Sequence, residues 1–213
     1  MSFEATIVDA GVGNLGNLAR ALAHLGAVVA ITGEPAAVAA ADCLLLPGVG
    51  AFKPPRERLR GALETALAEA LERGAWLLGI CVGYQLLFAS SDEFSDELGV
   101  TDGLGLLPGH VRRLPGDVPL PHIGWNRLEI ADSHPLLHGV AGGSYVYFVH
   151  SYAPRGVPAD ACLAAAVHGE RFAAVAGRGR VLGTQFHPEK SGRTGLRLLA
   201  NYLRLAHGEE PCG

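Results

Sequence analysis

The segment Gly79-Ile80-Cys81-Val82-Gly83, which directly follows the apolar run Ala75–Leu78, constrains the fold more than any other feature of this chain. The apolar run is typical of a buried strand, and the residues after the cysteine are typical of a helix start. A G-x-C-x-G pattern at a strand-to-helix junction is the cysteine form of a nucleophile elbow, a tight turn at the end of a sheet. We expect the flanking glycines to let the backbone bend sharply there. The segment therefore predicts an α/β fold with a cysteine nucleophile.

The position of Cys81 favours a reactive thiolate. The helix expected behind the turn has roughly half a positive charge and unpaired N–H groups at its N-terminus. This field stabilises the thiolate, which is the nucleophilic form of cysteine. An alternative is that Cys81 is a buried structural residue, as most unpaired cysteines are. The two flanking glycines favour the nucleophile.

The composition limits the classes of protein to which the chain can belong. Of its 213 residues, 49% are hydrophobic and 18% are charged, which is typical of a globular protein. The formal net charge of −4, without a basic block, argues against nucleic-acid binding. No apolar stretch approaches the roughly 20 residues of a membrane helix, and the N-terminus has no signal-peptide pattern. This predicts no membrane association. The four cysteines form no C-x-x-C pair, so we expect reduced thiols and a cytoplasmic location.

The first half of the chain alternates apolar runs with amphipathic segments. Strands are expected at residues 3–8, 27–31, 43–46 and 75–80, and helices at 15–25 and 56–73. Such a rhythm predicts a parallel sheet with helices on both faces. Further strands are expected at 145–149, 161–167, 172–176 and 180–186, before a last helix at 194–207. We therefore expect one α/β domain over residues 1–213, with a mostly parallel sheet and an antiparallel C-terminal extension.

Two other patterns suggest ligand sites less strongly. Gly11–Gly16 matches the G-x-G-x-x-G motif of dinucleotide-binding proteins, and Glu34 follows where a ribose-binding acid would lie. However, Asp9 would repel a pyrophosphate, and the cysteine elbow has no role in hydride transfer, so we favour a simple glycine turn. His134 and His138 lie four residues apart in a turn-rich region, and we expect no metal site there.

A base for the cysteine is expected in His187-Pro188-Glu189, at the end of an apolar run. In an extended segment, residues two apart point the same way, so Glu189 could orient His187. A cysteine, a histidine and a carboxylate together predict acyl transfer. The oxyanion of such a reaction needs N–H donors, for which Val82 and the loop Pro47–Gly50 are candidates.

These motifs resemble those of the class I (triad) glutamine amidotransferases, which share counterparts of Gly79–Gln85, Gln185–Glu189 and Pro47–Gly50. Further segments resemble the glutaminase subunits of imidazole glycerol phosphate synthases. These segments are Asp9–Leu15, Gly103–Leu106, Pro121–Asn126, Tyr147–Tyr152 and His187–Gly192. The resemblance therefore covers essentially the whole chain.

The resemblance implies roles for individual residues. Cys81 would attack the side-chain amide of L-glutamine, and His187, oriented by Glu189, would carry the proton to the departing ammonia. The glutamine and its oxyanion would be held by Gly48, Val49, Gly50, Val82, Gln85, Ser151 and Tyr152. Gln85 lies on the same helix face as Cys81; the alternative is a solvent-facing helix residue.

The resemblance also implies a partner and no cofactor. Glutaminase subunits of this family form a heterodimer with a (β/α)8-barrel cyclase subunit, which receives the ammonia through an internal channel. Candidate docking residues are Trp125, Asn126, Tyr147 and Lys190. Trp125, in a turn-rich segment, is typical of an interface anchor, and is equally compatible with a core position.

Three alternatives share part of this evidence. Another class I amidotransferase would have the same triad, but Pro121–Asn126 and Tyr147–Tyr152 argue against it. A related cysteine hydrolase would not need the motif His187–Gly192. A non-catalytic scaffold would have no use for an intact set of nucleophile, base and carboxylate.

Overall fold

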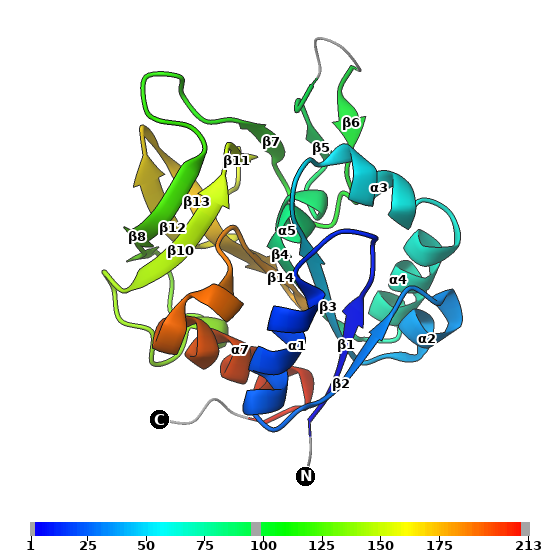
Figure 1. Cartoon of the computed structure of the whole chain (residues 1–213). Helices are drawn as coiled ribbons and strands as arrows, with labels where there is room; N and C mark the ends of the chain where they lie inside the picture. Colours follow the sequence, from blue (N-terminus) through cyan, green and yellow to red (C-terminus); the bar gives the residue numbers. More distant parts are fainter. Residues whose placement is uncertain (1–2, 95–98, 210–213) are drawn as a thin grey trace.

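A central sheet of eight strands organises the chain, of which the computed structural model describes residues 3–94 and 99–209. The strand order is β2-β1-β3-β4-β14-β13-β12-β9 (Figure 1). The parallel part comprises β1 (Glu4–Val8), β2 (Val28–Thr32), β3 (Cys43–Gly48), β4 (Trp76–Cys81) and β14 (Val181–Thr184). The antiparallel extension comprises β13 (Glu170–Arg178), β12 (Cys162–His168) and β9 (Glu129–Ile130). The predicted mostly parallel sheet with an antiparallel extension is confirmed.

Helices cover both faces of the parallel part (Figure 1). One side carries α1 (Leu15–His24) and α7 (Gly192–Ala206), and the other carries α2 (Pro35–Ala40), α3 (Lys53–Leu59) and α4 (Ala62–Glu72). The short α5 (Val82–Leu86) starts directly after β4, and two 3-10 turns, η1 (Pro135–Leu137) and η2 (Pro188–Lys190), lie later in the chain. Among the described residues, no helix is long and apolar enough to cross a membrane.

Two smaller sheets lie beside the antiparallel extension. One pairs β10 (Tyr145–His150) with β8 (His122–Arg127), and the other has the order β11-β7-β5-β6. The strands of the second sheet are β11 (Tyr152–Arg155), β7 (His110–Arg113), β5 (Ser90–Ser91) and β6 (Thr101–Asp102). The expectation of a turn-rich segment around Trp125 is wrong, because this residue lies within β8.

The expected single helix over residues 56–73 is also wrong. The structure has two helices there, because Gly61 adopts a φ of 80° between α3 and α4. A positive φ interrupts the helical backbone, and glycine adopts it at little cost. The helix α2, with the sequence Pro-Ala-Ala-Val-Ala-Ala, was not predicted, because six mostly small residues carry no clear amphipathic period.

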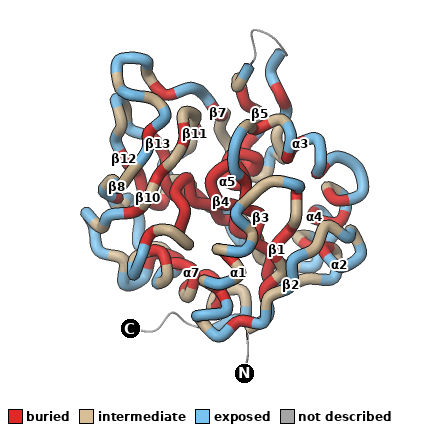
Figure 2. Tube along the Cα trace, in the orientation of Figure 1, coloured by how far each residue is buried: buried red, intermediate tan, exposed pale blue. Residues whose placement is uncertain are grey.

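The nucleophile elbow is buried, since β4 from Leu77 to Cys81 and all of α5 are coloured as buried in Figure 2. The expected role of its glycines needs correction, since Cys81 itself adopts the positive φ of 56°. A Cβ on Gly83 would lie 1.8 Å from the Leu46 carbonyl oxygen, and one on Gly79 would lie 2.7 Å from the Gly83 oxygen. The glycines are therefore required because α5 lies directly against the backbones of β3 and β4.

Candidate active site

Cys81 stands at the carboxyl end of β4, where functional groups gather in open α/β sheets. Its side chain is buried, with 2% of the residue exposed. Its Sγ lies 3.9 Å from the Val149 carbonyl oxygen, at the end of β10. Cys43 is buried and Cys162 is partly exposed; both are free, whereas Cys212 lies outside the described residues.

His187 follows β14, the strand next to β4, and lies at the same end of the sheet as Cys81. Strand β14 pairs in parallel with β4, with Thr184 opposite Ile80, so the chain leaves the sheet beside Cys81. The His187 Nδ1 atom lies 2.8 Å from the Glu189 Oε1 atom, and both side chains are 3% exposed. The expected contact is present, but its expected geometry is wrong: the residues after His187 form the 3-10 turn η2 rather than an extended segment.

The environment of His187 favours its protonated form. Burial of the imidazole lowers the pKa of His187, but its interactions with Cys81 and Glu189 raise that pKa more strongly, to about 9. Its Nε2 atom is buried without a hydrogen bond of standard geometry to any described residue. The free nitrogen is therefore the one that can exchange a proton with the thiol or a bound substrate.

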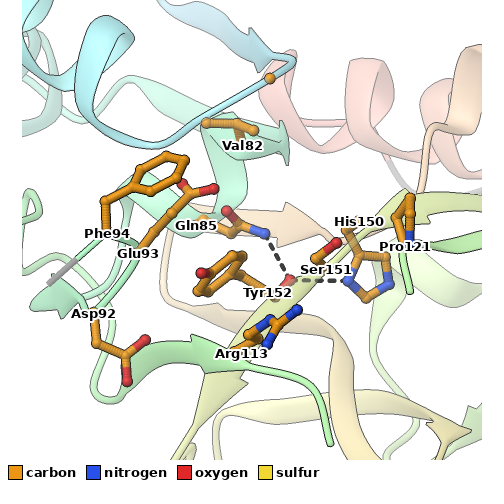
Figure 3. A pocket seen from close by; sticks show the side chains of 11 residues that line it. Val82, Gln85, Asp92, Glu93, Phe94, Arg113, Pro121, His150, Ser151 and Tyr152 are labelled. Carbon is orange, nitrogen blue, oxygen red and sulfur yellow. Dashed lines mark hydrogen bonds between the residues drawn. The ribbon is translucent and has the colours of Figure 1, made fainter. Parts of the chain in front are cut away.

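A pocket of about 650 Å³ opens beside the nucleophile elbow, where Val82 forms part of its lining (Figure 3). Its lining includes several residues that the sequence predicts for substrate binding, namely Gly50, Val82, Gln85, Ser151 and Tyr152. It also contains Asp92, Glu93, Phe94, Arg113, Pro121 and His150. Cys81 and His187 lie behind this lining rather than in it, since each is at most 2% exposed.

Gln85 is fixed in the wall of the pocket. Its Nε2 atom donates to the Tyr152 carbonyl oxygen over 2.8 Å and to Gln185 Oε1 over 3.1 Å. With 3% of the residue exposed, the alternative of a solvent-facing position is wrong.

The loop after β3 borders the nucleophile, as expected for oxyanion donors. Gly48 pairs with Cys81 in the register of β3 and β4. Gly50 lines the pocket with a φ of 82°, and Val49 between them is exposed. A Cβ on Gly48 would lie 2.8 Å from the Gly83 nitrogen, so this loop and the elbow are in close contact.

The charged residues of the pocket were missed in the sequence. Glu93 accepts a 2.6 Å hydrogen bond from the Phe52 N–H, and burial raises the pKa of this carboxyl while that bond lowers it. Arg113 pairs with Tyr152 across β7 and β11. Their sequence signal is weak because the adjacent charges Asp92-Glu93 and Arg112-Arg113 resemble ordinary charged surface residues. The pocket also unites elements that lie far apart in the chain.

The predicted docking residues separate into two groups. Trp125 and Tyr147 face each other across β8 and β10, with ring centroids 6.1 Å apart, and Lys190 Nζ lies 5.9 Å from the Tyr147 ring centroid. Trp125 is 56% exposed, so a core position is wrong. Asn126 alternates to the other face of β8, where its amide donates to His122 Nε2 and to the Val167 oxygen.

The glycine segment near the N-terminus has the geometry of a structural turn. The Asp9 carboxylate accepts a 2.8 Å hydrogen bond from the Gly11 N–H, and the Asn14 side chain caps α1. These contacts account for the segment without a nucleotide. Among the described residues, no group of three or more His, Cys, Asp or Glu side chains is arranged to hold a metal ion.

Comparisons with known proteins agree with this geometry. The family profile of class-I glutamine amidotransferases matches residues 6–205. Imidazole glycerol phosphate synthase subunit HisH of Symbiobacterium thermophilum is 48% identical over 200 residues, which cover 93% of this chain and 92% of that protein. This chain belongs to the HisH family of class-I glutamine amidotransferases. HisH of Salinibacter ruber is 45% identical over 213 residues, which cover 96% of each chain.

Solved structures of more distant proteins show the same fold. A crystal structure of a glutamine amidotransferase is 21% identical, with a TM-score of 0.73, and the match covers 97% of this chain and 100% of that chain. PurLQS from Thermotoga maritima is 19% identical, with a TM-score of 0.74, and the match covers 96% and 99%. The predicted class I amidotransferase fold and the predicted HisH family are confirmed, whereas the roles of individual residues stay predictions.

Proposed function

We propose that this chain is the glutaminase subunit of an imidazole glycerol phosphate synthase, which functions in histidine biosynthesis. It hydrolyses L-glutamine to glutamate and ammonia, and passes the ammonia to a (β/α)8-barrel cyclase subunit. The observation that carries this proposal is the convergence of Cys81, His187 and Glu189 at one end of the sheet, beside the pocket. Membership in the HisH family supports the same reaction.

The first half of the reaction forms a thioester. His187 takes the Cys81 proton, and the thiolate attacks the amide carbon of glutamine. The raised pKa of His187 supports its role as the group that holds the proton taken from the thiol. The imidazolium then gives its proton to the departing nitrogen, so that ammonia leaves and a glutamyl thioester remains.

The second half hydrolyses the thioester. His187 takes a proton from water, the hydroxide attacks the carbonyl carbon, and the thiolate leaves with glutamate as the product. In both halves, an oxyanion forms and needs N–H donors. The N–H of Val82 and that of the Val49–Gly50 peptide are our candidates, because both segments border the nucleophile.

Charged residues of the pocket suit the amino-acid end of glutamine. The Glu93 carboxylate is suited to the α-ammonium group, and the Arg113 guanidinium to the α-carboxylate. Gln85, Ser151 and Tyr152 would then hold the substrate side chain near Cys81.

Burial of Cys81 supports a requirement for the partner. A sulfur behind the pocket lining is poorly placed for attack, so we expect very low glutaminase activity in the isolated subunit. Docking of the cyclase through Trp125, Tyr147 and Lys190 would open the path. Trp125 lies on β8, which pairs with β10, and Tyr147 lies on β10, which also holds Val149. Lys190 lies on η2, which directly follows His187.

The decisive experiment measures glutamate release from glutamine, with and without a HisH-compatible cyclase and its nucleotide ligand. We expect strong stimulation by the partner. Cys81→Ala should reduce glutamine-dependent synthesis by a factor of roughly 10³ or more, while synthesis from ammonium salts by the same complex is unchanged. Cys162→Ala, which removes a thiol on β12, is the matched control and should retain both activities. Loss of both activities in Cys81→Ala would mean that Cys81 is structural.

A further inference from the structure

Two buried histidines lie opposite each other next to the pocket. His122 opens β8 and His150 closes β10, and the antiparallel register pairs them directly. They are 5% and 6% exposed, and His122 Nδ1 lies 3.1 Å from His150 Nε2. The glutaminase mechanism above uses neither ring.

The hydrogen-bond partners of the two rings determine which ring nitrogens carry a proton. His150 Nδ1 lies 2.8 Å from the Tyr152 carbonyl oxygen, which can only accept, so this nitrogen carries a proton. In a neutral ring, His150 Nε2 is then an acceptor, and His122 Nδ1 must donate to it. His122 Nε2 in turn accepts from the Asn126 amide over 3.2 Å. The amide cannot be reversed, because its oxygen accepts from the Arg127 N–H.

The surroundings keep both rings neutral. Burial lowers the pKa of His150 to about 3 and that of His122 to about 4. The His122 ring is stacked on Phe148 and His168, with centroids 4.8 and 4.1 Å away, and His150 packs against Phe172. A proton added to either ring would place two donors face to face, so the ordered chain requires neutral histidines.

The chain ends on a carbonyl that belongs to the pocket. The Tyr152 oxygen accepts from His150 and from Gln85, as the dashed lines in Figure 3 show. His150, Gln85 and Tyr152 all line the cavity. A carbonyl with two donors has both lone pairs engaged, and its peptide can rotate only by breaking a buried hydrogen bond.

We propose that His122 and His150 are positioning residues for the glutaminase reaction, because their hydrogen-bond chain fixes the Tyr152 carbonyl and with it Gln85. The chain anchors this wall of the pocket to Asn126, on the strand that exposes Trp125 on its other face. This inference rests on the proposed glutaminase function.

The test compares the wild-type cyclase complex with a double variant, His122→Phe/His150→Phe. Removing both partners of the buried bond while retaining aromatic rings should leave the thermal midpoint near that of the wild type. Loss of the donor to Tyr152 should raise KM for glutamine about 10-fold. The kcat should change less, and ammonium-dependent synthesis should not change. His150→Gln, whose amide can donate to Tyr152 and accept from His122, should recover most of the affinity.

Phe172→Leu is the matched control, because it loosens packing against His150 without touching the hydrogen bonds. A comparable rise of KM in that control would overturn the inference, since packing alone would then explain the effect. The inference would also be overturned if the KM for glutamine stayed within two-fold of the wild-type value in the double variant, or in the single variant His150→Phe. If wild-type complex fails to hydrolyse glutamine, the proposed function fails and this inference falls with it.

Discussion

Cys81 combines a positive φ with a side chain, which costs on the order of 1–3 kcal/mol. Strain of this kind persists only where the surroundings enforce it, and here α5 packs without space against two strands. The turn aims the sulfur away from the sheet and toward β10 and His187. This strain is therefore the cost in stability of holding the proposed nucleophile in position.

The titration of His187 should appear in the pH dependence of stability. Its pKa is raised from 6.5 to about 9 in the folded chain. The native state therefore keeps a proton that the unfolded state has lost, and the resulting stability is complete below pH 6.5 and lost as pH rises through 9. We expect wild type to exceed His187→Gln in free energy of unfolding by up to a few kcal/mol at pH 6.5, and by much less at pH 9.5.

Urea unfolding of both proteins at a series of pH values measures this difference. Glu189→Gln should show a weaker slope than wild type, because one of the contributions that raise the pKa of His187 is removed. A difference between wild type and His187→Gln that does not vary with pH would refute the raised pKa.

The sequence was informative for residues that share a short motif. Cys81, His187 and Glu189 could be assigned because each lies within a few positions of its glycines or proline. By contrast, His122 and His150 face each other only through the register of β8 and β10, which no local pattern encodes. Long-range registers of this kind explain why the buried histidine pair was not predicted.

At Gly83, α5 approaches β3 backbone against backbone, and this limits which residues can replace the glycine. A Cβ at Gly83 would lie 1.8 Å from the Leu46 oxygen, so Gly83→Ala must displace a strand or the helix. We expect a loss of at least about 3 kcal/mol in the free energy of unfolding, or no folded protein.

Gly61→Ala is the matched control for Gly83→Ala. Gly61 has a φ of 80° but nothing within 4 Å of an added Cβ, so only the backbone conformation is penalised, at about 1–3 kcal/mol. Thermal or urea unfolding of both variants measures the contrast. Equal losses would show that the close approach of α5 to β3 does not determine stability.

At the scale of helices and strands, the hydrophobic pattern predicted the parallel strands well because they are continuous apolar runs. The break between α3 and α4 was missed, since the amphipathic pattern continues across Gly61 and one glycine is tolerated in many helices. The strands of the β11-β7-β5-β6 sheet were missed because they are two to four residues long. Their pairing partners come from distant segments.

At the scale of the whole molecule, the predicted docking face is joined to the active site through β10. The Tyr147 carbonyl oxygen accepts from the His187 N–H over 3.0 Å, and the Tyr147 N–H donates to Ser191 Oγ over 3.0 Å. Any displacement of β10 by a partner therefore acts on the segment that carries the proposed base. This connection gives a physical route for the proposed stimulation of glutaminase activity by the cyclase.

Trp125→Ala should weaken the complex with the cyclase. A protruding tryptophan beside Tyr147 is typical of a binding hot spot, whose truncation costs about 2 kcal/mol or roughly 30-fold in Kd. Calorimetric titration of the two subunits measures the change. Val28→Ala, which removes a 61% exposed side chain from the edge strand β2, should leave Kd unchanged. An unaltered Kd in Trp125→Ala would exclude this face as the docking surface.

The junction of Leu46 with Gly83 has a consequence for how such a protein can diverge. Because main-chain atoms alone form it, no exchange of side chains can retune the spacing between the nucleophile and the loop after β3. Solved structures only 19–21% identical to this chain nevertheless share its architecture, with TM-scores of 0.73 and 0.74. We infer that this backbone contact sets the distance between Cys81 and the loop after β3, so that substitutions elsewhere in the chain leave that distance unchanged.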